Sequence, residues 1–122
     1  MEIRFENKVA FITGAAGGIG YAAARMFAEA GASVVMADLD SRVTDRAKEL
    51  EAEGHNAIGI RCDVSDEVQV KAAVEKAVAV FGKLDIAYNN VGIHAAVRED
   101  LAETEGWDFD RVISVNLRGV WN

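Results

Sequence analysis

The sequence predicts an α/β fold in which a doubly wound parallel sheet carries helices on both faces. Short apolar runs alternate with alanine-rich or amphipathic segments along the 122 residues, in the order β-α-β-α-β-α-β-α. This alternation is typical of parallel sheets, because right-handed crossovers place a helix over the sheet after each strand. The length allows one core, so we expect residues 1–122 to form a single domain.

The first two strands are predicted from nearly continuous apolar runs at residues 8–13 and 33–37. Such runs suit strands that are buried on both faces of a sheet. Between them, residues 21–30 are rich in alanine and predict a helix, which Gly31 ends. Residues 41–53 predict a polar helix that is also followed by a glycine.

The second half of the chain continues the same alternation. Ser65 is expected to cap the third helix, and Asp66 and Glu67 in its first turn complement the positive end of the helix dipole. The elements predicted here are a strand at 56–62, a helix ending at 81, a strand at 84–88 and a helix at 107–121.

Composition narrows the classes of partner. Acidic residues outnumber basic ones by 20 to 13, and the formal net charge is −7. We therefore expect no nucleic-acid partner and no membrane partner, since nucleic acids and anionic membranes attract basic surfaces, and no apolar run approaches the roughly 20 residues of a membrane span. The single cysteine, Cys62, can form no internal disulfide, which suits a reducing, cytoplasmic location. No metal site is predicted, because no recognised metal-ligand spacing is present.

A glycine cluster at residues 13–20 lies between the first strand and the first helix and indicates a dinucleotide site. Gly14 permits a tight turn, Gly18 lets the backbone approach a pyrophosphate, and Gly20 allows close packing of the helix on the strand. The helix N-terminus then offers free N–H groups to the phosphates. The alternative is a simple flexible connection. No Gly-Lys-Ser/Thr sequence is present, which argues against an ATP-type P-loop.

Asp38 strengthens the dinucleotide interpretation, because it ends the second strand 20 residues after Gly18. A carboxylate there can accept hydrogen bonds from the adenosine ribose and would repel the 2′-phosphate of NADP. Neither Ala16 nor Leu39 supplies a basic group to offset that repulsion, so NAD is favoured over NADP. Arg42 is near enough in sequence to keep NADP open. The alternative role for Asp38 is to cap the loop that follows it.

These motifs resemble those of the short-chain dehydrogenase/reductase family, over essentially the whole chain. The glycine motif matches, and residues 62–66 look like the family's segment after the third strand. Residues 89–92 resemble its Asn-Asn-Ala-Gly motif, with valine at 91. The resemblance implies that Asp63 and Val64 contact the adenine ring, although Asp63 could serve only the helix entry. It also implies that Asn90 supports the sheet and the nucleotide pocket, although an Asn-Asn pair could be only a turn. The expected cofactor-binding residues are Gly14, Ala16, Gly18, Ile19, Gly20, Asp38, Leu39, Asp63, Val64, Asn90, Val91 and Gly92.

Asn116 is the one predicted catalytic residue. It lies within an apolar stripe at helical spacing in the last predicted helix. A buried amide there must find partners or cost about 1–3 kcal/mol. The resemblance implies that Asn116 holds a water in a proton relay to a catalytic lysine. The alternative is a structural amide that bonds the backbone.

The family's remaining catalytic groups, a serine and a Tyr-x-x-x-Lys pair, have no match in the sequence. Tyr21 is followed four residues later by Arg25, and Tyr88 by Gly92. We therefore expect the NAD-binding, N-terminal portion of an enzyme that oxidises alcohols or reduces carbonyls by hydride transfer, inactive on its own. The alternatives are a non-catalytic nucleotide-binding module or a fragment that self-assembles.

The resemblance also implies a truncated, Rossmann-like sheet of about four strands in the order 3-2-1-4. The fourth strand would then lie at the edge with unpaired backbone groups. We therefore expect a homo-oligomer formed through that strand and the last helix.

Overall fold

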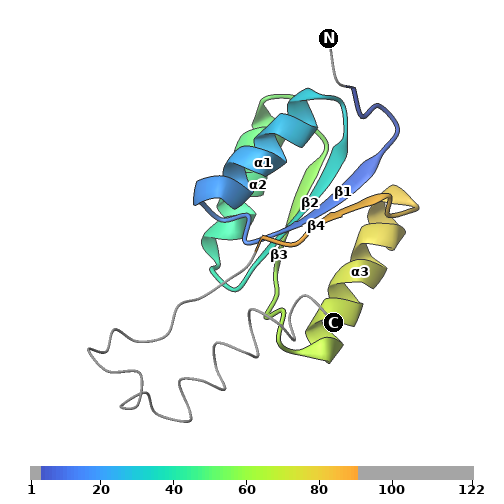
Figure 1. Ribbon diagram of the computed structural model, residues 1–122. Coiled ribbons are helices and arrows are strands. Elements are labelled where there is room, and N and C mark those ends of the chain that lie inside the picture. The colour runs from blue at the N-terminus through green and yellow to red at the C-terminus, as the bar shows by residue number, and fades with distance from the viewer. Residues whose placement is uncertain (1–3, 91–122) are drawn as a thin grey trace, which may run out of the picture.

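The computed structural model describes residues 4–90, which form one parallel sheet with helices on both faces (Figure 1). The strands are β1 (Val9–Thr13), β2 (Ser33–Asp38), β3 (Ala57–Arg61) and β4 (Ile86–Tyr88), and the helices are α1 (Gly18–Glu29), α2 (Arg42–Ala52) and α3 (Glu67–Phe81). The sheet order is β3-β2-β1-β4 and every pair is parallel, which confirms the predicted fold. The helix predicted at 107–121 lies outside the described residues.

The two faces of the sheet bury different residues of the same strands. On the face covered by α1 and α2, Ala10 and Ile12 of β1 pack with residues that include Leu50 of α2. On the face covered by α3, Val9 and Phe11 of β1 pack with small residues such as Ala73 and Ala77. Both faces of β1 are therefore buried, which explains why its sequence is continuously apolar and does not alternate between apolar and polar residues.

Glycines mark the helix ends largely as predicted. Gly31, Gly54 and Gly82 follow the three helices with φ of 99°, 95° and 82°, a left-handed conformation that glycine adopts without a Cβ penalty. The first helix, however, begins at Gly18 and not at residue 21. Glycine is a poor helix former, so local helix propensity did not predict this start.

The cap of α3 differs from the prediction. Asp66 is the N-cap, and its side chain accepts hydrogen bonds from the N–H groups of Val68 (3.0 Å) and Gln69 (3.4 Å). Ser65 was predicted in this role; instead its N–H and hydroxyl donate to one oxygen of Asp63, at 2.9 and 2.6 Å. The Ser65 assignment was wrong because Asp66 is the residue placed to reach the free N–H groups of the first helical turn.

Asp85 ties the start of β4 to the start of β1 across 76 positions of sequence. Its carboxylate accepts a hydrogen bond from the Val9 N–H at 2.9 Å and pairs with the Lys83 ammonium at 3.1 Å. Its own N–H donates to the Val9 carbonyl at 3.0 Å. The Val9 bond, followed by the Lys83 bond, holds the pKa of Asp85 below its ordinary value.

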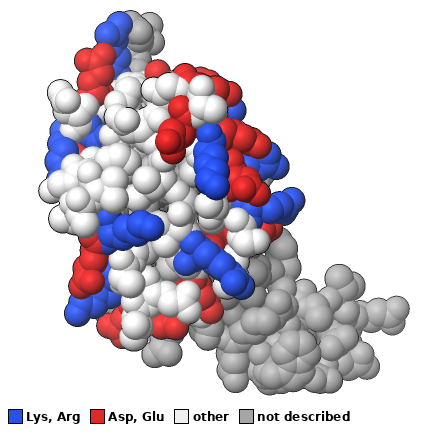
Figure 2. Space-filling model, turned by 180° about the vertical axis from the view of Figure 1, so that it is seen from behind, with Lys and Arg blue, Asp and Glu red and all other residues white. Residues whose placement is uncertain are grey.

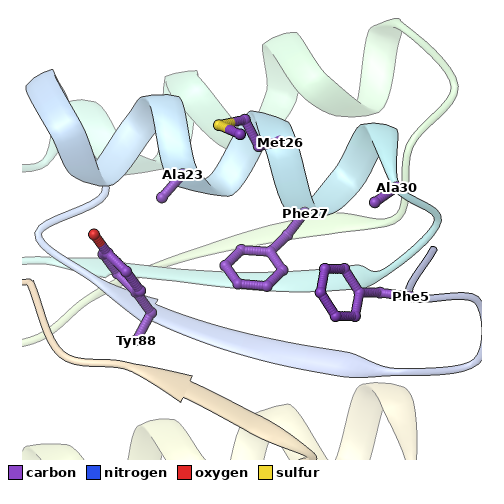
Figure 3. A pocket seen from close by; sticks show the side chains of 6 residues that line it. All are labelled: Phe5, Ala23, Met26, Phe27, Ala30 and Tyr88. Atoms are coloured by element: carbon purple, nitrogen blue, oxygen red, sulfur yellow. The ribbon is translucent and has the colours of Figure 1, made fainter. Parts of the chain in front are cut away.

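The outer surface beside β4 contains an apolar hollow of about 410 Å³ between α1 and the edge of the sheet (Figure 3). Phe27 of α1 makes edge contacts with Tyr88, with ring centroids 6.4 Å apart, and Phe5 packs on Phe27 at 5.2 Å. Met26 is 70% exposed at the rim. Elsewhere, basic and acidic side chains are interspersed over the face shown in Figure 2. Within residues 4–90, no helix is long and apolar enough to cross a membrane.

The Asp85 contacts generate a pH-dependent prediction. Asp85→Asn should lower the free energy of unfolding at neutral pH, because the lowered pKa means that the fold stabilises the charged carboxylate. This stabilisation is present above the ordinary pKa of 3.8 and is lost as the pH falls through the lower folded-state value. Urea unfolding at successively lower pH should therefore show the variant and the parent chain converging.

The matched control is Lys83→Met, which removes the ammonium and keeps the bond between Asp85 and Val9. Its effect should be smaller than that of Asp85→Asn, since the Val9 bond is the larger cause of the shift. An equal difference between Asp85→Asn and the parent chain at every pH would contradict the assignment.

Candidate nucleotide-binding site

The predicted site residues that lie within residues 4–90 follow the carboxyl ends of the strands of the sheet. The chain leaves β1 for β2 on one side, whereas β4 pairs on the other side of β1 after the crossover through α3. Such a reversal leaves a crevice at the carboxyl ends of the two central strands, where open α/β sheets bind their ligands. The topology thus puts the glycine turn after β1 at this switch point.

The glycine turn closes tightly on itself and on the end of β4. Gly14 and Gly18 have φ of 65° and 59°, in the left-handed region. A Cβ on Gly20 would overlap the carbonyl oxygen of Gly14 and would lie 2.9 Å from the side-chain nitrogen of Asn90. Gly14 and Asn90 therefore both lie close to Gly20, and the absence of a side chain at Gly20 is needed for that approach.

Asp38 ends β2, as the sequence predicted, and its side chain reaches the turn. One carboxylate oxygen accepts the N–H of Ala16 at 3.0 Å, and the other accepts the N–H of Asp40 at 2.9 Å. The neighbouring Ala15 N–H donates to the Ala37 carbonyl at 3.2 Å. Asp38 therefore does cap its own loop, and it also fixes the turn. Each carboxylate oxygen can accept a further bond, so this arrangement leaves acceptor capacity for a ribose diol.

The segment after β3 joins the same edge through its backbone. The Cys62 N–H donates to the Asp38 carbonyl at 2.9 Å, and the Asp63 N–H donates to the side chain of Gln69 at 2.9 Å. The Asp63 carboxylate is engaged with Ser65, which is the helix-entry role that the sequence left open. Val64 is buried.

Two apolar side chains beside the site are exposed to solvent. Ile19 is 71% exposed and Leu39 is 56% exposed. Val91, Gly92 and Asn116 lie outside the described residues, so their expected roles stay predictions. Among residues 4–90, no group of three His, Cys or carboxylate side chains is placed to hold a metal ion. Burial raises the pKa of the Cys62 thiol, so this cysteine is an unreactive core group.

Sequence reasoning missed Thr13 as a site residue. Its hydroxyl accepts the Asn90 N–H at 2.9 Å and donates to the Tyr88 carbonyl at 3.4 Å. This hydroxyl therefore holds the end of β4 against the end of β1, directly below the glycine turn. The sequence did contain a signal for Thr13, because it is the one hydroxyl residue in an otherwise apolar strand. Once buried, such a hydroxyl needs a hydrogen-bond partner.

Sequence reasoning also missed Arg46, on α2. Its Nε donates to the Ala16 carbonyl at 3.1 Å, across 30 positions of sequence. Arg42 was the basic residue that, by its nearness in sequence, kept NADP open as a cofactor. Its guanidinium pairs with Asp40 at 2.8 Å. No local pattern distinguishes the two arginines, because the difference arises only when α2 packs beside the turn.

Comparison with known proteins identifies the family. A family model described as short chain dehydrogenase matches residues 8–122. The chain belongs to this family. It is 46% identical over 119 residues to borneol dehydrogenase, mitochondrial, from Lavandula x intermedia, covering 97% of this chain and 44% of that protein. It is 44% identical over 119 residues to secoisolariciresinol dehydrogenase from Forsythia intermedia, covering 97% and 42%. The chain thus spans less than half the length of these curated relatives.

Two solved structures share the fold closely. A short chain dehydrogenase/reductase from Burkholderia phymatum, in complex with NAD, superposes with a TM-score of 0.92 at 38% identity, over 98% of this chain and 42% of that chain. A 3-ketoacyl-(acyl-carrier-protein) reductase from Brucella melitensis, complexed with NADH, gives a TM-score of 0.83 at 42% identity, over 95% and 46%.

The close approach at Gly20 predicts a sharp difference between two glycines of the turn. Gly20→Ala should destabilise the chain by about 1–3 kcal/mol through overpacking against Gly14, despite the better helix propensity of alanine. Gly17→Ala is the matched control: its backbone is extended, with φ −172°, and a Cβ there meets nothing within 4 Å. Chemical denaturation of both variants checks this, and equal stabilities would contradict the packing argument.

Proposed function

We propose that this chain supplies the NAD-binding part of a short-chain dehydrogenase. The observation that carries the proposal is the pairing of Asp38 with the Ala16 N–H, which brings an acidic group to the glycine turn. Support comes from the solved relatives described in complex with NAD and with NADH. The steric constraint at Gly20 also supports the proposal, because the absence of a Cβ there lets the turn close at the start of α1.

Each part of the dinucleotide would meet a different group. The N–H groups at the start of α1 would hold the pyrophosphate, because they lie at the positive end of the helix dipole. Asp38 would accept the hydroxyls of the adenosine ribose and disfavour a 2′-phosphate. Exposed Leu39 would offer apolar surface beside the adenosine, and Asp63 and Val64 would lie near the adenine ring. When bound, the nicotinamide ring supplies the hydride acceptor or donor.

Oxidation of an alcohol or reduction of a carbonyl is proposed for the whole protein. Asn116 would take part in its proton relay, with Val91 and Gly92 close to the cofactor. The serine and the Tyr-x-x-x-Lys pair have no match within the 122 residues. Purified chain of these 122 residues should therefore bind cofactor without transferring hydride, and turnover of an alcohol by a mass-verified sample would contradict this.

Self-association through β4 is also proposed. Among residues 4–90, β4 pairs only with β1, an arrangement that would leave its other edge open to a second strand, and Tyr88 on β4 is 37% exposed. Light scattering at tens of micromolar should give a mass above that of one chain. A monomer at that concentration would contradict the proposal. The cytoplasmic location stays a prediction.

Calorimetric titration with NAD tests the cofactor assignment. The parent chain should bind NAD more tightly than NADP. Asp38→Asn should weaken NAD binding about tenfold and narrow the difference from NADP, because it removes a charge-assisted hydrogen bond and the repulsion of a 2′-phosphate.

The matched control is Asp40→Asn. It removes one negative charge two residues away from Asp38, from a carboxylate that pairs with Arg42. This variant should keep the parent preference for NAD. Absence of heat with millimolar NAD would refute NAD binding, and an unchanged preference in Asp38→Asn would refute the role of Asp38.

A further inference from the structure

Arg46 reaches from α2 to the glycine turn and fixes one of its peptides. Its Nε donates to the Ala16 carbonyl at 3.1 Å. On the other side of the same residue, the Ala16 N–H donates to Asp38 at 3.0 Å. The two peptides that flank Ala16 are therefore each held by a charged side chain, one from β2 and one from α2. Ala16 itself is buried, at 3% exposure.

The bond to Arg46 determines which way the next N–H group points. The Ala16 carbonyl and the Gly17 N–H belong to one peptide, and this peptide is trans, as are all peptides in residues 4–90. In a trans peptide the carbonyl and the N–H point in opposite directions. Because the carbonyl turns toward Arg46 and α2, the Gly17 N–H turns away from α2. Gly17 is the N-cap of α1, so this N–H joins the amides at the start of that helix.

Arg46 is itself held in place by its neighbours on two helices. Its guanidinium carbon lies 5.1 Å from the centroid of the Tyr21 ring on α1, a cation–π distance. Its Nη1 pairs with Glu49 at 3.2 Å, and the Tyr21 hydroxyl donates to the same carboxylate at 2.9 Å. Arg25 lies 5.5 Å from the centroid of the same ring, donates a hydrogen bond to the Tyr21 hydroxyl at 2.9 Å and pairs with Glu53. The cluster therefore restrains the Arg46 side chain in the position that meets Ala16.

We propose that Arg46 is a positioning residue that sets the orientation of the peptide between Ala16 and Gly17, and through it the affinity of the turn for the adenosine and pyrophosphate part of a dinucleotide. The inference rests on the proposed binding of NAD at this turn. Arg46 acts through the backbone and not by touching the nucleotide. Its effect therefore falls equally on every ligand that shares the ADP-ribose moiety.

Titration of variants with three ligands tests this assignment. Arg46→Gln should weaken the binding of ADP-ribose, NAD and NADP by the same factor, about threefold to tenfold for a half-exposed hydrogen bond with a charged donor. Arg46→Lys should recover part of the loss, since an ammonium group can still donate to the Ala16 carbonyl. The matched control, Arg25→Gln, removes the other arginine of the cluster and should bind all three ligands as the parent chain does.

The ligand pattern separates positioning from direct contact. A loss for NADP clearly larger than for NAD would mean that Arg46 meets the 2′-phosphate, and would overturn the proposal. Parent-like affinities in Arg46→Gln would overturn it as well. So would a loss of the same size in Arg25→Gln, because that would point to the cluster as a whole.

Amide hydrogen exchange without cofactor gives an independent readout. In Arg46→Gln the Ala16 amide should exchange faster than in the parent chain, whereas amides of β3 should not change. Unchanged exchange at Ala16 would contradict the positioning role even if the parent chain bound no NAD. Failure of the parent chain to bind NAD would refute the proposed function separately, and the exchange result would still decide whether Arg46 fixes the turn.

Discussion

Gly20 has to pack against the carbonyl of Gly14 for α1 to meet the sheet in the observed way. No side chain fits there, because a Cβ would overlap that oxygen and would also crowd Asn90 after β4. This one steric constraint joins three segments: the turn after β1, the first turn of α1 and the end of β4. With the three held together, the start of α1 lies at the carboxyl end of β1, beside the crevice that the strand order leaves between β1 and β4.

The hydrogen bonds around Asp38 order its carboxylate without any ligand, as its proposed role in binding a ribose would require. A flexible carboxylate would lose conformational freedom on meeting a ribose, and that loss would reduce affinity. Here two backbone N–H groups, of Ala16 and Asp40, already fix both oxygens. The interpretations of Asp38 as a loop cap and as a ribose acceptor are thus compatible, since the first prepares the geometry that the second requires.

Local sequence patterns predicted the order of strands and helices well, because period, apolar runs and helix-ending glycines such as Gly31 and Gly82 act within a few residues. They also singled out Gly14, Gly20 and Asp38, which the structure places at the turn after β1. They could not find the contacts of Arg46 with Ala16 or of Asp85 with Val9, which span 30 and 76 positions and exist only after packing. The N-cap of α3 was predicted wrongly for a different reason. Serine and aspartate are both good N-cap residues, and only the backbone geometry decides between Ser65 and Asp66.

The placement of β4 beside β1 has a consequence for the order in which the chain can fold. Pairing of β1 with β2 and of β2 with β3 joins segments that are near in sequence, whereas pairing of β1 with β4 closes a loop of most of the described chain. Closing that loop carries the larger entropic cost and is favourable only when earlier contacts have shortened it. The Thr13 hydroxyl bonds the Asn90 N–H only after this closure. This order of contacts predicts that the crevice is completed late in folding. A nucleotide that binds the crevice would then bind only those chains in which β4 has already paired with β1.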